Sequence, residues 1–291
     1  MSDQALGLRE LARRFPLQQK KEQTTAGPRI LAVASGKGGV GKTSLVLNLA
    51  IAIAQQGKRV VVFDADLGMA NIDILLGLIP RFTLYDVFLG HKDIDDILLE
   101  GPHNVLIIPG GSGVQELANM DYYQRKRLIE SLSSFHHRAD YLLIDTGAGI
   151  SRNVLGFLGA AQEVLLVVTP EPTAITDAYG IMKILSKFSV HSQIKIVVNR
   201  ASSRSEAKNT MTKLEMAAER FLQIKVQSLG YVREDKAVAQ AVKEQEPLVI
   251  KYPHADASQD IFRLAGIILN IHVESPRGMN HFLNRLLRLF S

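Results

Sequence analysis

A glycine-rich turn, GKGGVGKTS from Gly36 to Ser44, carries the residue types best suited to chemistry in this chain. It follows an apolar run of strand length, Ile30 to Ser35, and precedes apolar residues at helical spacing from Leu45. In such a strand-to-helix turn, backbone N–H groups freed by glycines and the helix N-terminus form an anion site. Lys42 can reach the terminal phosphates of a nucleotide, and the Thr43 hydroxyl can bind Mg²⁺. The pattern predicts a P-loop.

Aspartates end two further apolar strands. DADLGMANID begins at Asp64, and DYLLIDTGAGI carries Asp145. Because parallel strands of an open α/β sheet present their carboxyl ends at one edge, we expect both segments near the P-loop. We predict that Asp145 holds Mg²⁺ through water, that Asp64 lies near the magnesium shell, and that Asp66 polarises the attacking water. Helix capping or turn formation is the alternative for Asp64 and Asp66.

The apolar strand Ile194 to Ala201 ends in Asn199 and Arg200. An asparagine side chain can pair with a donor and an acceptor on one edge of adenine. We therefore predict that Asn199 contacts the base, with a plain turn asparagine as the alternative.

Composition narrows the class of protein. The chain has 291 residues, 46% of them hydrophobic and 22% charged, as in a soluble globular protein. It has no cysteine, which excludes an iron–sulfur cluster held by thiolates. The net charge of +5 permits an anionic partner, either membrane or nucleic acid. We find no signal-peptide pattern and no uncharged stretch of transmembrane length.

Strand and helix patterns alternate along most of the chain. This predicts an α/β fold with a doubly wound, mostly parallel sheet and helices on both faces. We place one domain at residues 30–274, a flexible segment at 1–29 and a separate amphipathic helix at 275–291. Residues 81–101 read as short helical pieces without chemistry, and a helix is expected at about Tyr122 to Phe135.

The turn KGGVGKT resembles the deviant Walker A motif of the family that contains MinD, ParA and the nitrogenase iron protein. DTGAG, from Asp145, resembles its switch II segment. The resemblance implies an ATP hydrolase in which Lys37 crosses a homodimer interface to the partner's nucleotide; a solvated loop lysine is the alternative. Lys37, Lys42 and Asp66 are then the catalytic residues. The implied ligands are ATP and Mg²⁺, with Thr43, Asp64 and Asp145 at the metal and the nucleotide held by Gly38, Gly39, Val40, Gly41, Lys42, Thr43, Ser44, Asn199 and Arg200.

The stretch that begins at Arg233 resembles the segment that closes over the base in MinD. Arg233 stands where that segment has proline, so the resemblance alone does not establish a base contact there.

Near the N-terminus, DQALGLR resembles the DQAxxLR motif of the FlhG (FleN/YlxH) branch of flagellar-number regulators. That resemblance implies stimulation of the signal-recognition-type GTPase FlhF, and flagellar basal-body (C-ring) proteins as further candidate partners. The alternative is a disordered leader without function. The candidate contacts with the GTPase are Asp3, Gln4, Leu6, Leu8 and Arg9.

The last segment, MNHFLNRLLRLFS, has apolar residues at steps of three and four, with polar residues on its other face. It is too short to span a bilayer but suits an interface with anionic lipid, and it resembles MinD-type membrane-targeting tails. We predict reversible attachment of a cytoplasmic protein to the inner face of the cell membrane; a final helix packed on the core is the alternative. The predicted membrane-binding residues are Phe282, Leu283, Arg285, Leu286, Leu287, Arg288, Leu289 and Phe290.

Three rival functions remain: a MinD-type division-site ATPase, a ParA-like DNA-segregation ATPase and a small-molecule kinase. The lipid-type tail and the absence of a clear basic DNA-binding surface disfavour nucleic acid. The N-terminal motif favours the flagellar branch over MinD, which begins almost directly at its first strand. Glycine at position 147, where MinD usually has proline, agrees with that choice.

Overall fold

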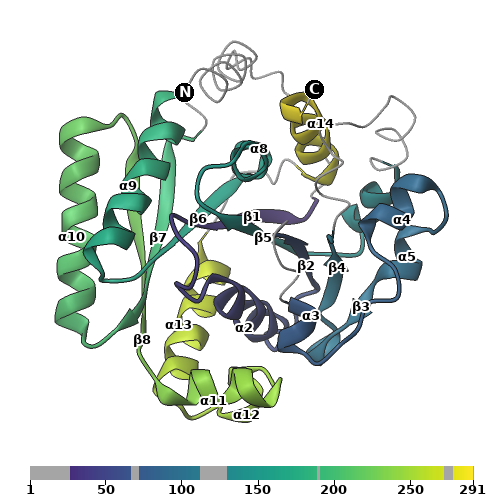
Figure 1. Cartoon of the computed structure of the whole chain (residues 1–291), viewed down its shortest axis with the longest axis horizontal. Helices are drawn as coiled ribbons and strands as arrows, with labels where there is room; N and C mark the ends of the chain where they lie inside the picture. The colour runs from purple at the N-terminus through teal and green to yellow at the C-terminus, as the bar shows by residue number, and fades with distance from the viewer. Residues whose placement is uncertain (1–26, 67–71, 112–129, 189–190, 272–277, 291) are drawn as a thin grey trace.

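The computed structural model describes residues 27–66, 72–111, 130–188, 191–271 and 278–290. Within them, eight strands form one sheet in the order β3-β4-β2-β5-β1-β6-β7-β8 (Figure 1). Every neighbouring pair is parallel except β3 and β4, which are antiparallel. The prediction of a doubly wound, mostly parallel α/β sheet is therefore confirmed.

The strands are β1 (Arg29–Ser35), β2 (Val60–Ala65), β3 (Leu99–Glu100), β4 (Leu106–Pro109), β5 (Tyr141–Ala148), β6 (Glu163–Val168), β7 (Gln193–Ala201) and β8 (Lys225–Arg233). The helices are α2 (Lys42–Ala54), α3 (Ile72–Leu75), α4 (Leu84–Leu89), α5 (Ile94–Ile97), α8 (Arg152–Ala160), α9 (Pro172–Lys187), α10 (Arg204–Phe221), α11 (Lys236–Glu244), α12 (Leu248–Lys251), α13 (Asp256–Asn270) and α14 (Gly278–Phe290), with short 3₁₀ turns η1 (Pro102–Asn104) and η2 (Ser134–His136).

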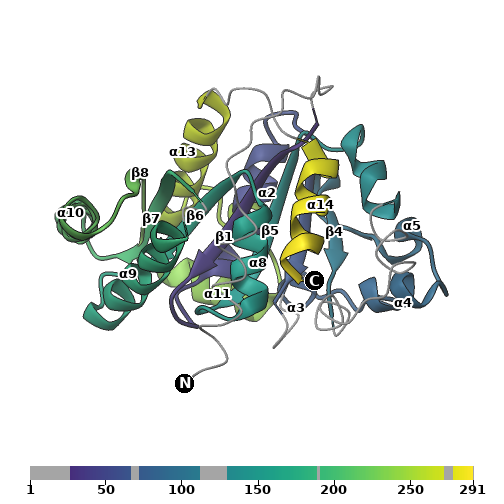
Figure 2. The same cartoon turned by 90° about the horizontal axis from the view of Figure 1, so that it is seen from above.

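The central strands are buried on both faces, which explains why they read as continuous apolar runs. In β1, Ile30, Ala32 and Ala34 join one hydrophobic cluster, while Leu31 and Val33 join the other. Residues of α8, α9, α10 and α14 contribute to the first cluster, and those of α2 and α13 to the second. Figure 1 shows these two sets of helices on opposite faces of the sheet, and Figure 2 shows the same layers from above.

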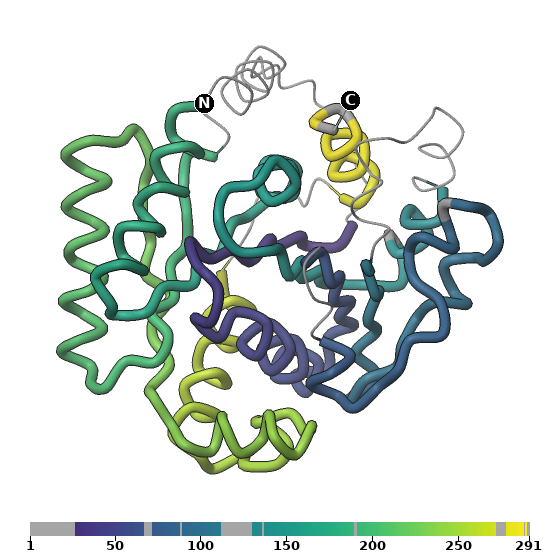
Figure 3. The backbone as a smooth tube through the Cα atoms, viewed as in Figure 1, coloured from purple at the N-terminus to yellow at the C-terminus, as the bar shows by residue number. Residues whose placement is uncertain are grey.

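The path of the chain places the P-loop centrally. β1 lies in the middle of the sheet; the chain builds β2 to β4 on one side of it and then β6 to β8 on the other (Figure 3). The order of the strands thus reverses next to β1, and ligands of open α/β sheets bind at the carboxyl ends of the strands at such a point.

Two details differ from the expectations drawn from the sequence. The short strand β3 was not predicted, because two residues carry no periodic signal. Of the helix expected at Tyr122 to Phe135, residues up to 129 lie outside the described residues; residues 130–133 are helical, as predicted, and the 3₁₀ turn η2 takes over at Ser134. The short helices α4 and α5 do lie in the segment where short helical pieces were predicted.

Candidate active site

The glycine-rich turn connects β1 to α2 in the conformation that a phosphate-binding loop needs. Gly39 and Gly41 have φ angles of 78° and 82°, in the left-handed region that favours glycine. A Cβ built on Gly38 or Gly39 would meet no atom within 4 Å, so this part of the turn is open to a ligand. Gly41 precedes the first helical residue, Lys42, and the turn therefore leads into a free helix N-terminus.

Gly36 is required for a different reason. A Cβ built there would lie 2.4 Å from the Asp177 Cβ and 2.5 Å from the Asp177 backbone carbon. Helix α9 thus packs directly against the first residue of the P-loop. The Ser35 hydroxyl donates a hydrogen bond to the Lys37 carbonyl oxygen at 3.0 Å, which further fixes the start of the loop.

Lys42 and Asp145 form a buried ion pair across the site. The Lys42 Nζ atom lies 2.5 Å from the Asp145 Oδ1 atom, and the side chains are 6% and 0% exposed. Asp145 is placed there by strand register, because it pairs with Val33 of β1 on one side and with Asp64 of β2 on the other. Burial raises the pKa of Asp145, while the Lys42 ammonium and the Thr43 hydroxyl oppose that shift.

Asp64 and Asp66 extend from the carboxyl end of β2 and the residue that follows it. Asp64 is buried, and its carboxylate accepts hydrogen bonds from the backbone N–H groups of Asp66 at 3.2 Å and Ile72 at 3.4 Å. Asp64 thus contacts both the residue that follows β2 and the first residue of α3, as the turn alternative would require. Asp66 lies beside switch II, since a Cβ on Gly147 would be 3.4 Å from the Asp66 Oδ1 atom. Residues 67–71, in the middle of the DADLGMANID segment, lie outside the described residues.

Switch II is hydrogen-bonded to the strand that carries the P-loop. The Gly149 N–H donates to the Ser35 carbonyl oxygen at 2.8 Å, and Gly149 has a φ angle of 84°. The Thr146 hydroxyl donates to the Val33 carbonyl oxygen at 2.9 Å. These two hydrogen bonds connect the chain after Asp145 to the strand that leads into the P-loop.

Asn199 lies at the P-loop but has a backbone partner. Its Nδ2 atom donates to the Val40 carbonyl oxygen at 2.7 Å, and a Cβ on Gly41 would collide with it at 2.6 Å. The asparagine therefore supports the loop, and its contact with adenine stays a prediction. Arg200 has a φ angle of 56° and lies 3.2 Å from the Glu234 carboxylate at the same edge of the sheet.

Lys37 does not lie in the buried part of the site. Its ammonium group forms an ion pair with Glu171 and lies 3.2 Å from the Thr173 hydroxyl oxygen. The Lys37 and Glu171 side chains are 31% and 52% exposed. No local pattern singles out Glu171 as the partner of Lys37, since the two residues are far apart in the chain.

Comparisons with known proteins agree with this geometry. Residues 31–248 match the CobQ/CobB/MinD/ParA nucleotide binding domain. The chain is 40% identical to the antiactivator FleN of Pseudomonas aeruginosa, over 89% of this chain and 94% of that protein. It is 31% identical to the flagellum site-determining protein YlxH of Helicobacter pylori, over 89% and 90% of the two chains.

The chain belongs to the FleN (FlhG) family of MinD/ParA-type ATPases. Solved structures agree with this assignment. The MinC:MinD cell division protein complex of Aquifex aeolicus matches with a TM-score of 0.67 and 28% identity, over 86% of this chain and 99% of that one. MinD complexed with Mg-ADP from Pyrococcus horikoshii matches with a TM-score of 0.66 and 26% identity, over 84% and 96%.

The residues of this FleN-family site fit magnesium and nucleotide. The second carboxylate oxygen of Asp145, Oδ2, is buried and accepts no hydrogen bond from the described residues. A buried anionic oxygen without a donor is suited to a hydrated cation. The described residues contain no cluster of three or more histidine or acidic side chains that could hold a metal by themselves. Magnesium bound here would need the Thr43 hydroxyl and oxygens of the nucleotide as well.

The segment that begins at Arg233, the last residue of β8, has a structural role in this FleN-family chain. Arg233 binds Asp260 of α13, with its Nε atom 2.7 Å from the carboxylate, and it also pairs with Asp256. Asp235 caps α11 and accepts a second hydrogen bond from the Ala257 N–H. The stretch that resembles the base-covering segment of MinD is thereby fixed to α13.

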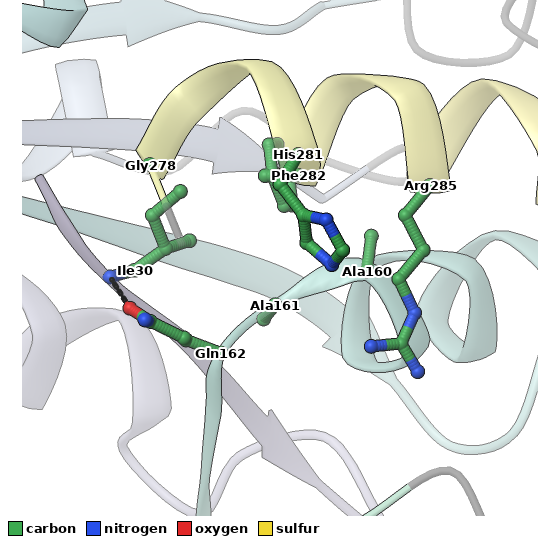
Figure 4. A pocket seen from close by; sticks show the side chains of 8 residues that line it. All are labelled: Ile30, Ala160, Ala161, Gln162, Gly278, His281, Phe282 and Arg285. Carbon is green, nitrogen blue, oxygen red and sulfur yellow. Dashed lines mark hydrogen bonds between the residues drawn. The ribbon is translucent and has the colours of Figure 1, made fainter. Parts of the chain in front are cut away.

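The C-terminal helix α14 packs on the FleN-family domain. It contacts α8, β1 and η2, and its N-terminal half lies over Ile30 and the turn after α8 (Figure 4). Ser133 also donates to the Asn280 side chain at 2.6 Å. The buried residues are Met279, Phe282, Leu283, Leu286, Leu287 and Leu289.

For residues 278–290 the structure therefore corrects the prediction of a separate tail and shows the packed alternative. The physical reason is that the apolar stripe finds an apolar surface on its own domain. Of the predicted membrane-binding residues, Phe282, Leu283, Leu286, Leu287 and Leu289 are buried here. Arg285 borders the pocket under the helix, and the side chains of Arg288 and Phe290 are outside the described part of the chain. Membrane binding stays a prediction.

The predicted GTPase contacts, Asp3, Gln4, Leu6, Leu8 and Arg9, all lie outside the described residues. Their role also stays a prediction. No described helix is both long and apolar enough to cross a membrane.

A buried charge network on the opposite edge of the sheet was not predicted. The Glu163 carboxylate pairs with both Arg29 and Lys195, and all three side chains are at most 10% exposed. The Arg29 guanidinium also donates to the carbonyl oxygens of Ile268 at 2.6 Å and Ile271 at 3.2 Å, at the C-terminal end of α13. The sequence offers only a weak signal for it, namely single charged residues at the first position of β1 and β6 and at the third position of β7.

Proposed function

We propose that this chain regulates flagellar number and placement as an ATP-dependent homodimer that binds membrane reversibly and stimulates the GTPase FlhF through its N-terminus. The observation that carries the proposal is the Lys42–Asp145 pair joining the P-loop to switch II, in a chain 40% identical to an antiactivator named FleN. The similarity to YlxH, named a flagellum site-determining protein, supports the flagellar assignment.

The buried pair makes the site responsive to its substrate. In the structure, the charges of Lys42 and Asp145 neutralise each other. ATP would offer Lys42 phosphate oxygens in place of its carboxylate partner, and Asp145 would then be available to hold a hydrated cation. Magnesium bound at this position would neutralise charge on the transferred phosphoryl group. Since Gly149 and Thr146 follow Asp145 and are bonded to β1, the exchange alters the chain that forms switch II.

Asp66 supplies the remaining part of the reaction. It lies beside Gly147 of switch II, within the segment that follows β2. In the proposed reaction its carboxylate orients the water that attacks the terminal phosphate. Lys37 would contribute its positive charge to the nucleotide of the partner chain, so that dimerisation completes each site.

Membrane binding, in this proposal, exchanges one apolar surface for another. Exposing a large buried apolar side chain to water costs about 1.5 to 3 kcal/mol, and α14 buries several such side chains. The helix therefore leaves α8 only where lipid can accept its apolar face. Two helices on one dimer raise the avidity by a factor of about 10² to 10⁴ over one, which would link lipid binding to ATP.

The first experiment measures molar mass by light scattering with ATP or ADP, using Asp66→Ala to slow hydrolysis. The proposal predicts a dimer with ATP and a monomer with ADP, and Lys37→Ala should stay monomeric. A monomer at saturating ATP would refute the proposed cycle.

The second experiment follows α14 directly. Hydrogen exchange of its backbone amides should be slow with ADP, and should change only when ATP and anionic vesicles are both present. Co-sedimentation with zwitterionic vesicles is the control. If the α14 amides exchange as slowly in a vesicle-bound sample as they do in solution, another surface binds the lipid.

The third experiment tests the flagellar role. A peptide of residues 1–15 should raise the turnover of FlhF, and the same peptide with Gln4→Ala should not. In cells, Lys42→Ala should fail to restore normal flagellar number. Normal flagellation in cells with the Lys42→Ala variant, together with misplaced division sites in cells that lack the protein, would favour a MinD-type function.

A further inference from the structure

Lys37 is held by its own chain at the N-terminus of α9. Its ammonium group contacts the Glu171 carboxylate and lies 3.2 Å from the Thr173 hydroxyl oxygen. Glu171 is the residue before the helix, and its side chain makes no capping hydrogen bond to the helix. The carboxylate is therefore committed to Lys37 rather than to the helix it precedes.

We propose that Glu171, assisted by Thr173, is a positioning residue that latches Lys37 within its own chain and must release it before the ATP dimer can form. The inference rests on the proposed function, in which Lys37 reaches the partner's nucleotide. Glu171 thus binds an ammonium group of its own chain. The strength of this contact helps to set the protein concentration at which ATP drives dimerisation.

The backbone around Lys37 is too constrained to move the lysine by itself. Gly36, the preceding residue, touches α9 so closely that a Cβ would lie 2.4 Å from the Asp177 Cβ. The Lys37 carbonyl oxygen accepts a hydrogen bond from the Ser35 hydroxyl. Release of Lys37 is therefore mainly a rotation of its side chain, between a position on Glu171 and a position reaching away from the domain.

Electrostatics assign the holding role to Glu171. The N-terminus of a helix carries partial positive charge, which repels an ammonium group. α9 begins at Pro172, so Lys37 lies at an unfavourable end of this helix unless a carboxylate is present. The Lys37 ammonium lowers the pKa of the Glu171 carboxyl, so the carboxylate stays charged at neutral pH. Glutamine in its place would leave the lysine facing the helix N-terminus with only the Thr173 hydroxyl.

The latch is weak enough to be reversible. Both side chains are partly exposed, at 31% and 52%, and exposed ion pairs contribute little. Each dimer opens two latches, so the effect of one pair is squared in the dimer dissociation constant. Removing the latch should therefore tighten the ATP dimer by about 2- to 30-fold.

The experiment compares the ATP-dependent dimer dissociation constants of two proteins, Asp66→Ala alone and Asp66→Ala with Glu171→Gln, by analytical ultracentrifugation. The expected result is a tighter dimer for the second protein. Because the latch is an ion pair, its effect should shrink as salt is raised. A matched control is Asp95→Asn, which removes an exposed carboxylate of α5 that pairs with Arg138, away from α9 (Figure 1). It should leave the constant unchanged.

The failures are distinguishable. If the Asp66→Ala protein forms no ATP dimer, or if Lys37→Ala does not weaken the dimer, the proposed function is wrong and the latch falls with it. If the dimer depends on Lys37 but Glu171→Gln leaves it equal or weaker, only the latch is overturned. A readout on the monomer is independent of pairing: by NMR, the Glu171 carboxyl should titrate at lower pH in the wild type than in Lys37→Ala. Equal titration would also overturn it.

Discussion

Replacing Glu163 by glutamine should destabilise the domain far more than the loss of an exposed carboxylate does. Glu163 is the shared partner of Arg29 and Lys195, and no side chain of the three is more than 10% exposed. Glutamine keeps the shape but removes the charge, leaving two buried cations beside each other. Breaking a buried ion pair by removing one partner costs about 3 to 5 kcal/mol.

A second loss adds to the first. Arg29 is oriented by Glu163, at 2.9 Å between its Nη2 atom and the carboxylate, while its Nη1 atom donates to the Ile268 carbonyl oxygen. Without Glu163, the guanidinium loses the partner that directs it toward the end of α13. For a domain of this size, the loss corresponds to a fall in Tm of about 6 to 20 °C.

The assay is urea and thermal unfolding followed by circular dichroism, with two comparison variants. Asp95→Asn removes a carboxylate from an exposed pair and should change the unfolding free energy by less than about 1 kcal/mol. Lys195→Met removes the cation that Glu163 cannot fully neutralise and should be nearly neutral or stabilising. If Glu163→Gln lowers the unfolding free energy no more than Asp95→Asn does, charge neutralisation by Glu163 does not stabilise the domain.

The remaining predictions concern the site and pH. Lys42→Ala should lower ATP affinity by about 10²-fold in equilibrium dialysis, because a charge-assisted contact is lost; unchanged affinity would contradict the P-loop assignment. Asp66→Ala should bind ATP normally but hydrolyse it about 10²-fold more slowly or worse in single-turnover assays; normal turnover would remove Asp66 from its role. Gly36→Ala should lose about 1 to 3 kcal/mol of stability through collision with α9, whereas Gly38→Ala, with open space around it, should unfold like the wild type. Burial and the Arg29 charge lower the pKa of Lys195 to about 8, so the folded state releases this proton at a lower pH than the unfolded chain does. The unfolding free energy should therefore rise between pH 8 and 10.5. A Lys195→Met protein with the same rise would contradict this.

The parts of the fold that could be predicted from the sequence are those whose signals are local. The P-loop turn, the apolar strands and the aspartates at their carboxyl ends each have a pattern that register then brings together, as with Asp64 and Asp145 on paired strands. Gly36 and Asn199 show the limit of such patterns. Gly36 was predicted as part of the phosphate-binding turn and Asn199 as a contact of the base. Their immediate surroundings are α9 and the Val40 carbonyl, which only the tertiary structure supplies.

The C-terminal helix shows a second limit. Apolar residues at steps of three and four give one stripe on a helix, whether the stripe meets lipid or protein. The pattern therefore predicted α14 as a helix with an apolar face, but it could not choose the surface that the face covers. Likewise, the partners of Glu163 and Lys37 come from distant parts of the chain, and no local rule connects them.

The contact of Arg29 with the end of α13 joins the start of β1 to the point where α13 ends. Arg29 follows the first described residues, Gly27 and Pro28, and it binds the Ile271 carbonyl oxygen where the chain departs toward α14. Arg29 and Ile271 thus lie together at the amino-terminal end of the sheet's strands, away from the P-loop. A force applied to the chain at Gly27 would therefore reach the end of α13 through the hydrogen bonds of Arg29.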